Sequence, residues 1–125
     1  MTTDTDQLVT VQCILHATDH DVAEFLGFFD QDTVFQMGNS GPVVGRDAIT
    51  QWVGGYLASV TGTTHEVLKI WESDGAFAVR IDVTYRMQGG QSVTLPAMVE
   101  IRLREGVVTH YLIFIDPSPV EEASR

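Results

Sequence analysis

The sequence has little cysteine and little positive charge. Cys13 is the only cysteine among 125 residues, which excludes an internal disulfide and a cysteine-based zinc or iron–sulfur site. The chain has seven Lys and Arg residues and seventeen Asp and Glu residues, so its formal net charge is −10. No Lys or Arg precedes Arg46. A field of that sign repels phosphate backbones and anionic lipid, so we expect no nucleic-acid or membrane partner. The composition favours a small, mostly neutral ligand, and the lone thiol favours a cytoplasmic location.

Long apolar runs and signs of disorder are missing as well. No run approaches the ~20 apolar residues of a membrane span, and the polar, acidic residues 1–6 are unlike a secretory signal. Hydrophobic residues make up 44% of the chain and charged residues only 19%, as in a folded protein. We expect one domain over residues 1–117 and a flexible, proline-broken tail over residues 118–125.

The first half of the chain has helical periodicity. Apolar side chains recur every three or four positions, the spacing that places them on one face of a helix. Polar residues at 18–21 interrupt the pattern and can cap a helix. The expected helices span residues 4–16, 22–29 and 46–59.

After Gly62 the period changes from helical to alternating, which is typical of strands with one buried face. Short turn sequences separate the segments, and short connections join antiparallel neighbours. Together with a short strand ahead of the third helix, the expected strands span residues 33–37, 64–71, 76–87, 92–104 and 107–116. Helices followed by an antiparallel meander predict an α+β domain.

The strand over residues 76–87 has two interpretations. One face carries Val79, Ile81, Val83 and Tyr85, and the other carries Arg80, Asp82, Thr84 and Arg86. In the first interpretation the apolar row packs on the core, and Arg80 and Asp82 form an ordinary exposed ion pair. In the second, the polar row faces a ligand cavity and the apolar row packs against a second subunit. Neighbouring strands carry apolar residues on both faces, which favours a homodimer through the outer sheet face.

An acidic turn ahead of a short strand, and a Gly-Arg-Asp turn ahead of the third helix, form the most characteristic stretch of the sequence. Residues 28–35 are FFDQDTVF and residues 44–49 are VGRDAI. On these segments the chain resembles the nuclear-transport-factor-2-like, or SnoaL-like, superfamily, and the resemblance extends from Leu8 to Asp116. It implies a cone-shaped curved antiparallel sheet, wrapped by three N-terminal helices and enclosing a pocket. That fold serves isomerases, cyclases, hydrolases and binding domains, so function requires a separate argument.

Within the superfamily, the limonene-epoxide-hydrolase branch gives the nearest match. Its Arg-x-Asp motif on the second long strand resembles Arg80 and Asp82. The resemblance implies that Asp82 is the general acid toward an epoxide oxygen and that Arg80 holds the carboxylate. The water-activating Tyr, Asn and second Asp of that family correspond by register to Phe35, Met37 and Ile113. Hydrolysis by an activated water is therefore not implied.

Two other branches of the superfamily match less well. The base of ketosteroid isomerases would fall on Met37, and their oxyanion-binding Asp would fall near Val99. Polyketide cyclases carry an acidic residue on the last strand, where this chain has none before Asp116. Asp116 lies on the opposite strand face from Ile113 and replaces it only through a bulge.

The four histidines do not predict a metal site. His16 and His20 are four residues apart, but Asp19 is expected to end the helix between them, and no third ligand is evident. His65 has no identifiable partner. His110 shares a strand face with apolar residues and is expected on a surface or dimer face.

These observations predict a cofactor-free enzyme for a terpenoid, steroid or polyketide-like substrate. Asp82 and Arg80 are the expected catalytic residues, with Asp82 as acid or base in epoxide opening, cyclisation or isomerisation. The expected substrate-binding residues are Phe35, Met37, Trp52, Tyr56, Thr84, Leu95, Ala97, Val99, Tyr111 and Ile113. The alternative is a non-catalytic ligand-binding or dimerisation domain of the same fold.

Overall fold

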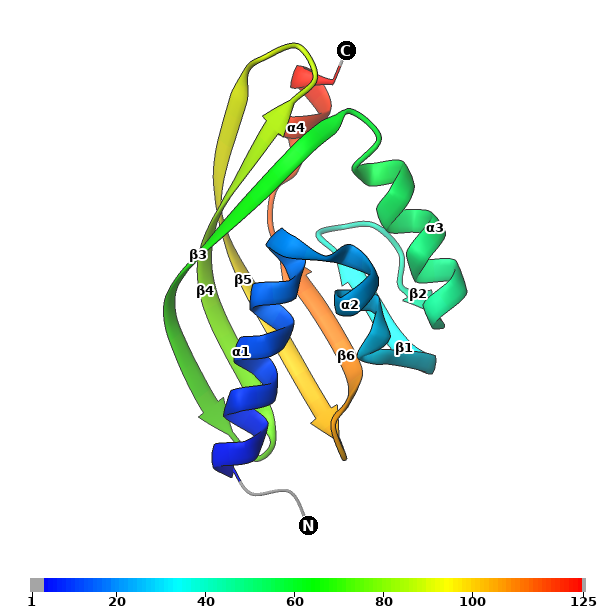
Figure 1. Cartoon of the computed structure of the whole chain (residues 1–125), viewed down its shortest axis with the longest axis vertical. Coiled ribbons are helices and arrows are strands. Elements are labelled where there is room, and N and C mark those ends of the chain that lie inside the picture. The colour runs from blue at the N-terminus through cyan, green and yellow to red at the C-terminus, as the bar shows by residue number, and fades with distance from the viewer. Residues whose placement is uncertain (1–3, 125) are drawn as a thin grey trace.

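A six-stranded sheet with helices on one side makes up residues 4–124, the part of the chain that the computed structural model describes (Figure 1). Residues 1–3 and Arg125, the ends of the expected domain and tail, lie outside this part. The elements are α1 (Asp4–His20), α2 (Val22–Gly27), β1 (Phe29–Met37), β2 (Val43–Val44), α3 (Arg46–Tyr56), β3 (Val60–Ser73), β4 (Ala76–Met87), β5 (Ser92–Arg104), β6 (Val107–Phe114) and α4 (Ser118–Ala123). The expected α+β class, with a curved sheet and N-terminal helices, is confirmed.

The strands follow the order β2-β1-β6-β5-β4-β3 across the sheet. Strands β3 to β6 form the expected antiparallel meander. Two of its turns, at residues 74–75 and 105–106, have positive φ at both central residues, which matches the twist of the flanking strands. Strand β1 joins β6 in parallel, with Phe35 opposite Tyr111. The short strand β2, which the sequence did not indicate, pairs with β1 at one edge.

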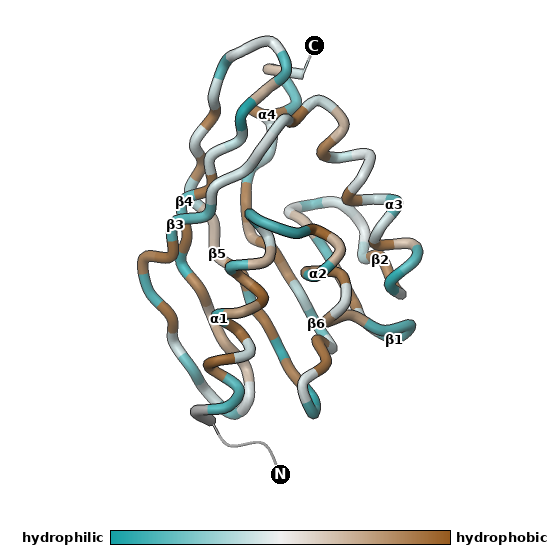
Figure 2. The backbone as a smooth tube through the Cα atoms, viewed as in Figure 1, coloured by the Kyte–Doolittle hydropathy of each residue, from teal (hydrophilic) through white to brown (hydrophobic). Residues whose placement is uncertain are grey.

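The alternation along β4 decides which face of the sheet is the core. The odd-numbered side chains Phe77, Val79, Ile81, Val83, Tyr85 and Met87 are buried. Arg80 is exposed, and Asp82 and Thr84 are partly exposed on the opposite face. Figure 2 shows the same alternation of hydropathy along the strands. Burying an apolar side chain stabilises the fold by about 1.5–3 kcal/mol, whereas burying a charge costs several kcal/mol. The interpretation that turned Arg80 and Asp82 inward is therefore wrong.

Several elements end at residues other than those expected. Helix α1 continues through the capping stretch as far as His20, and α3 ends at Tyr56 instead of near Ser59. Strand β1 begins at Phe29 and β3 at Val60, each several residues early. Periodicity is weakest at element ends, where a few residues are too short a segment to show a repeat.

The C-terminal segment is a packed helix instead of the expected irregular tail. Helix α4 covers Ser118–Ala123 and places Pro119 in its first turn, where a missing N–H is tolerated. Val120 has an exposed fraction of 1% and belongs to the hydrophobic core. The fold therefore extends beyond residue 117 to the end of the described residues.

No helix within residues 4–124 is both long and apolar enough to cross a membrane. The single cysteine, Cys13, lies exposed on α1. The cytoplasmic location that this lone thiol suggested stays a prediction.

Candidate active site

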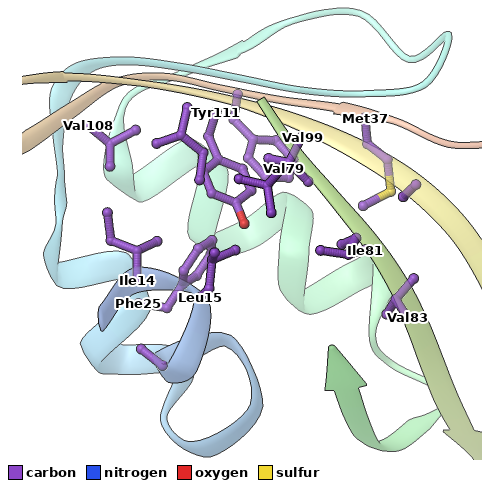
Figure 3. Close-up of a cluster of buried hydrophobic side chains, with 14 of the residues drawn as sticks. Ile14, Leu15, Phe25, Met37, Val79, Ile81, Val83, Val99, Val108 and Tyr111 are labelled. Carbon is purple, nitrogen blue, oxygen red and sulfur yellow. The ribbon is translucent and has the colours of Figure 1, made fainter. Parts of the chain in front are cut away.

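An apolar cavity of about 80 Å³ lies between the inner face of the sheet and the helices. Figure 3 shows buried side chains from different elements on this face of the sheet, and Phe25, Met37, Val99 and Tyr111 among them line the cavity. A water molecule needs about 10–15 Å³ of such space, so the cavity has room for roughly five to eight waters. That space suits a ligand with a single small ring.

Most of the residues expected to bind substrate line this cavity. They are Phe35, Met37, Trp52, Tyr56, Ala97, Val99, Tyr111 and Ile113. Leu95 is buried on the same sheet face but is not part of the lining. Thr84 lies on the outer face, where its hydroxyl is 2.9 Å from that of Thr94. Binding of a ligand by the lining residues stays a prediction.

The two residues expected to be catalytic lie outside the cavity. Arg80 stands between Lys69 and Met98 on the outer face of the sheet, one row away from Asp82. No ion pair joins Arg80 to Asp82 in the described part of the chain. Because the sheet separates them from the cavity, Asp82 cannot donate a proton to a ligand inside it. The motif that resembled limonene-epoxide hydrolases is therefore on the wrong face for that role.

A different acid/base pair, Asp19 with His65, does reach the cavity. His65 lies on β3 opposite Val83 and lines the cavity with Thr18 and Thr63. Its Nδ1 is 2.5 Å from Asp19 Oδ1, and its backbone N–H donates to Asp19 Oδ2 at 2.7 Å. The two side chains keep exposed fractions of only 16% and 15%. The contact fixes the end of α1 against β3.

The surroundings of His65 Nδ1 indicate where its proton lies. Thr18 Oγ1 donates to the Leu15 carbonyl at 2.6 Å, so its lone pairs are available to His65 Nδ1 at 3.3 Å. Nδ1 therefore faces two acceptors, the Thr18 hydroxyl and the Asp19 carboxylate. A proton on Nδ1 satisfies both, and in the neutral ring with that tautomer Nε2 is the nitrogen able to accept a proton.

No local pattern in the sequence indicates this pair. Asp19 was expected to interrupt a helix, and His65 had no partner because its carboxylate lies 46 positions earlier. His16 and His20, in contrast, both remain on α1, and their rings lie 4.1 Å apart at its exposed end. The described residues contain no group of three or more side chains arranged to hold a metal ion.

Three tyrosines supply the other hydroxyl groups of the cavity. Trp52 stacks on Tyr56 at 5.5 Å between ring centroids, and Tyr56 meets Tyr85 edge-on at 5.9 Å. The Tyr56 hydroxyl is buried and forms no well-aligned hydrogen bond with a described residue, although the nearby Tyr85 hydroxyl is close enough to affect its pKa. Burial raises the pKa of Tyr56, Tyr85 and Tyr111 above that of free tyrosine. All three are therefore neutral hydrogen-bond donors at physiological pH.

A curved sheet and helices that enclose an apolar cavity, with a few polar groups in its wall, define a cone-shaped fold suited to small molecules. The profile of a protein family described as SnoaL-like domain matches residues 13–111. The chain belongs to this SnoaL-like family, within the nuclear-transport-factor-2-like superfamily, which confirms the resemblance noted in its sequence.

Solved structures with the same fold come from proteins that are described in different ways. AclR, a proposed hydroxylase from Streptomyces galilaeus, is 20% identical, with 98% of this chain and 97% of that chain covered and a TM-score of 0.81. A proposed SnoaL-like polyketide cyclase from Jannaschia sp. CCS1 is 15% identical, with coverages of 95% and 91% and a TM-score of 0.82. A hypothetical protein with a ketosteroid isomerase-like fold from Catenulispora acidiphila, in complex with trimethylamine, is 14% identical, with coverages of 91% and 86% and a TM-score of 0.73. At such identities the likeness shows the fold alone.

Proposed function

We propose that the protein catalyses proton transfer on a small apolar molecule, with His65 as the proton acceptor. The observation that carries the proposal is the 2.5 Å contact between His65 Nδ1 and Asp19 in the wall of an apolar cavity. Asp19 is a positioning residue that holds the ring with Nε2 free. This pair takes the role first expected of Asp82 and Arg80.

The cavity supports such chemistry in two ways. When Nε2 accepts a proton, the imidazolium that forms is stabilised by the Asp19 carboxylate at Nδ1. A ligand that fills the largely apolar cavity displaces its water, which strengthens electrostatic interactions inside the cavity. Isomerisation and cyclisation need a base of this kind, whereas epoxide opening needs the protonated ring as an acid.

Deuterium exchange and epoxide opening distinguish these reactions. Cyclohexanone in D₂O reports proton abstraction by NMR, and cyclohexene oxide reports ring opening. His65→Gln should lower the rate by about 10²–10⁴-fold, the usual contribution of a general base. Asp19→Asn should lower the rate without changing the affinity for the probe.

Asp82→Asn is the matched control, because Asp82 is a carboxylate on the other face of the same sheet. Its rate should equal that of the wild type. The assignment of the base would be refuted if His65→Gln kept a rate within two-fold of the wild type. It would also be refuted if Asp82→Asn lowered the rate by the 10²–10⁴-fold expected of His65→Gln.

A second candidate function is binding without chemistry. It is favoured by the apolar cavity residues Phe35, Met37, Val99 and Ile113, because the resemblance in sequence implies catalytic groups at these positions in other branches of the superfamily. In that case the protein retains the probes, both are recovered unchanged, and no deuterium is incorporated.

The proposed partner besides the ligand is a second copy of this chain, docked on the outer sheet face. Two positive charges, Lys69 and Arg80, are cross-strand neighbours there, and two negative charges, Glu66 and Asp82, occupy the next row. Like charges directly opposite each other destabilise a sheet. Consider a two-fold axis that lies parallel to the sheet, perpendicular to β4 and between these two rows of charges. It would bring the outer faces of two subunits together and would place each Arg80 opposite Asp82 of the partner subunit. Exposed Phe114, beside these rows, would be covered in such a dimer.

A further inference from the structure

Two adjacent glycines, Gly54 and Gly55, lie in the second half of α3, where the helix gains nothing from them. Both are exposed, neither has a positive φ, and a Cβ added at either position would meet nothing within 4 Å. Inside a helix, glycine is about five-fold less favourable than alanine, because its backbone loses more freedom on folding. The pair therefore weakens this part of α3 although neither packing nor backbone geometry requires a glycine.

The weakened half of α3 covers the cavity. In the first half of the helix Ile49 is buried, and Arg46 Nε donates to the Phe29 carbonyl at 2.8 Å. The side chains of the second half line the cavity and are only partly buried: Trp52, Val53, Tyr56 and Leu57. Side chains that border empty space have fewer packing partners. The second half of α3 is thus held less firmly than the first.

A surface groove of about 250 Å³ adjoins the cavity at this end of α3. The residues that line both the groove and the cavity are Thr18, Val22, Leu57 and Thr63, and we call their junction the mouth. Val22 begins α2 and Leu57 directly follows α3, so two helices meet at the mouth. Val22 has an exposed fraction of 43%, which places an apolar side chain where a ligand leaves water.

A second groove adjoins the cavity beside α4 and shares Met37 and Ile115 with it. This end of the cavity is held firmly. Val120 of α4 has an exposed fraction of 1%, and Asp116 Oδ1 accepts hydrogen bonds from the backbone N–H and the hydroxyl of Ser118. Movement of α4 would expose part of the core, so the mouth is the easier way in.

We propose that ligands enter and leave the cavity through the mouth, between Val22 and Leu57, and that Gly54 and Gly55 are the hinge on which the last turn of α3 opens. Lids of this kind hinge on a few residues and move in microseconds to milliseconds. The inference goes beyond the proposed function, since it holds whether or not His65 transfers a proton.

Opening of this turn costs few contacts. Its Leu57 N–H donates to the Val53 carbonyl at 2.9 Å, at a helix end where water can replace the bond. Beyond the helix, the Gln88 N–H donates to the Ser59 carbonyl at 3.0 Å, so the chain stays fixed at the start of β3. The first half of α3 fixes the other side of the hinge. The movement is therefore confined to the turn that covers the cavity.

Benzene is a suitable probe, because an apolar cavity takes up a single small ring without a hydrogen bond. NMR of methyl groups in the cavity wall, such as those of Ile81 and Val83, measures its association and dissociation rates. Gly54→Ala combined with Gly55→Ala should lower both rates by about twenty-fold, since alanine favours the closed helix. The Kd should stay within about two-fold of the wild type, because the free and bound states are both closed.

Gly27→Ala is the matched control, because Gly27 is also an exposed helical glycine with open space around it. It lies at the other end of α2 from the mouth and should leave both rates unchanged. Val22→Phe narrows the mouth and should lower both rates at least five-fold. Asn39→Phe, an exposed position in the groove beside α4, should have no effect.

Amide hydrogen exchange tests the hinge without a ligand. Exchange of the Leu57 and Ala58 amide protons should slow by about twenty-fold in the double alanine variant. The proposal is overturned if the wild type takes up no benzene, or if the double alanine variant keeps the wild-type benzene rates, even with slowed amide exchange. It is also overturned if Asn39→Phe slows benzene exchange and Val22→Phe does not, because the entrance then lies beside α4.

Discussion

Removing the Tyr56 hydroxyl should make the protein more stable. A hydroxyl buried without a partner costs about 1–3 kcal/mol, and Tyr56→Phe deletes that group while it leaves the ring contacts with Trp52 and Tyr85 in place. We expect a gain of about 1 kcal/mol in the free energy of unfolding, which corresponds to about 3–6 °C in the melting temperature of a domain of this size.

Urea denaturation measures this change directly, with Tyr85→Phe as the matched control. The Tyr85 hydroxyl is not among the buried, unpaired atoms of the described residues, so its removal should change stability less. A Tyr56→Phe variant less stable than the wild type by 1 kcal/mol or more would show that the hydroxyl is satisfied in solution.

Two further predictions concern the outer face and the tyrosines. Asp82→Arg should weaken self-association at least ten-fold in sedimentation equilibrium. The double variant that also carries Arg80→Asp should restore self-association, because the charges of the proposed dimer are then exchanged. Equal association of all three proteins would contradict that dimer. The pKa of all three tyrosines is raised by burial, so the folded state holds these protons after the unfolded state has lost them, and stability should fall as the pH rises above about 10. Phenolate absorbance at 295 nm that develops near pH 10 while the protein stays folded would refute this expectation.

Much of the fold could be predicted from the sequence because its strands alternate regularly. Strand β4 has the bounds expected from the alternation, residues 76–87, since a turn sequence closes each of its ends. The parity of that strand was harder to decide. Apolar residues such as Met98 and Leu112 lie on the outer face, so both faces offered an apparent core. The free-energy cost of burying charge decides which face of β4 turns to the core, because the row with Arg80 and Asp82 carries charge.

The candidate site divides into a part that pattern could reach and a part that it could not. Apolar lining residues such as Phe35 and Ile113 follow from strand parity and helical faces. The contact of Asp19 with His65 depends on how the last turn of α1 meets β3, and no local pattern records that packing. The unpaired Tyr56 hydroxyl is likewise a property of three-dimensional packing, since a buried tyrosine usually finds a partner.

The parallel pairing of β1 with β6 has a consequence for how the protein folds. Phe35 and Tyr111 are far apart in the sequence, yet their rings stack at 6.1 Å with an angle of 4° between their planes. The meander of β3 to β6 joins strands that follow one another directly, so it can form early, whereas closing the long loop to β1 is entropically slower. Both rings line the cavity, so the cavity is completed only when β1 docks. Ligand binding during refolding would therefore report the last stage of assembly.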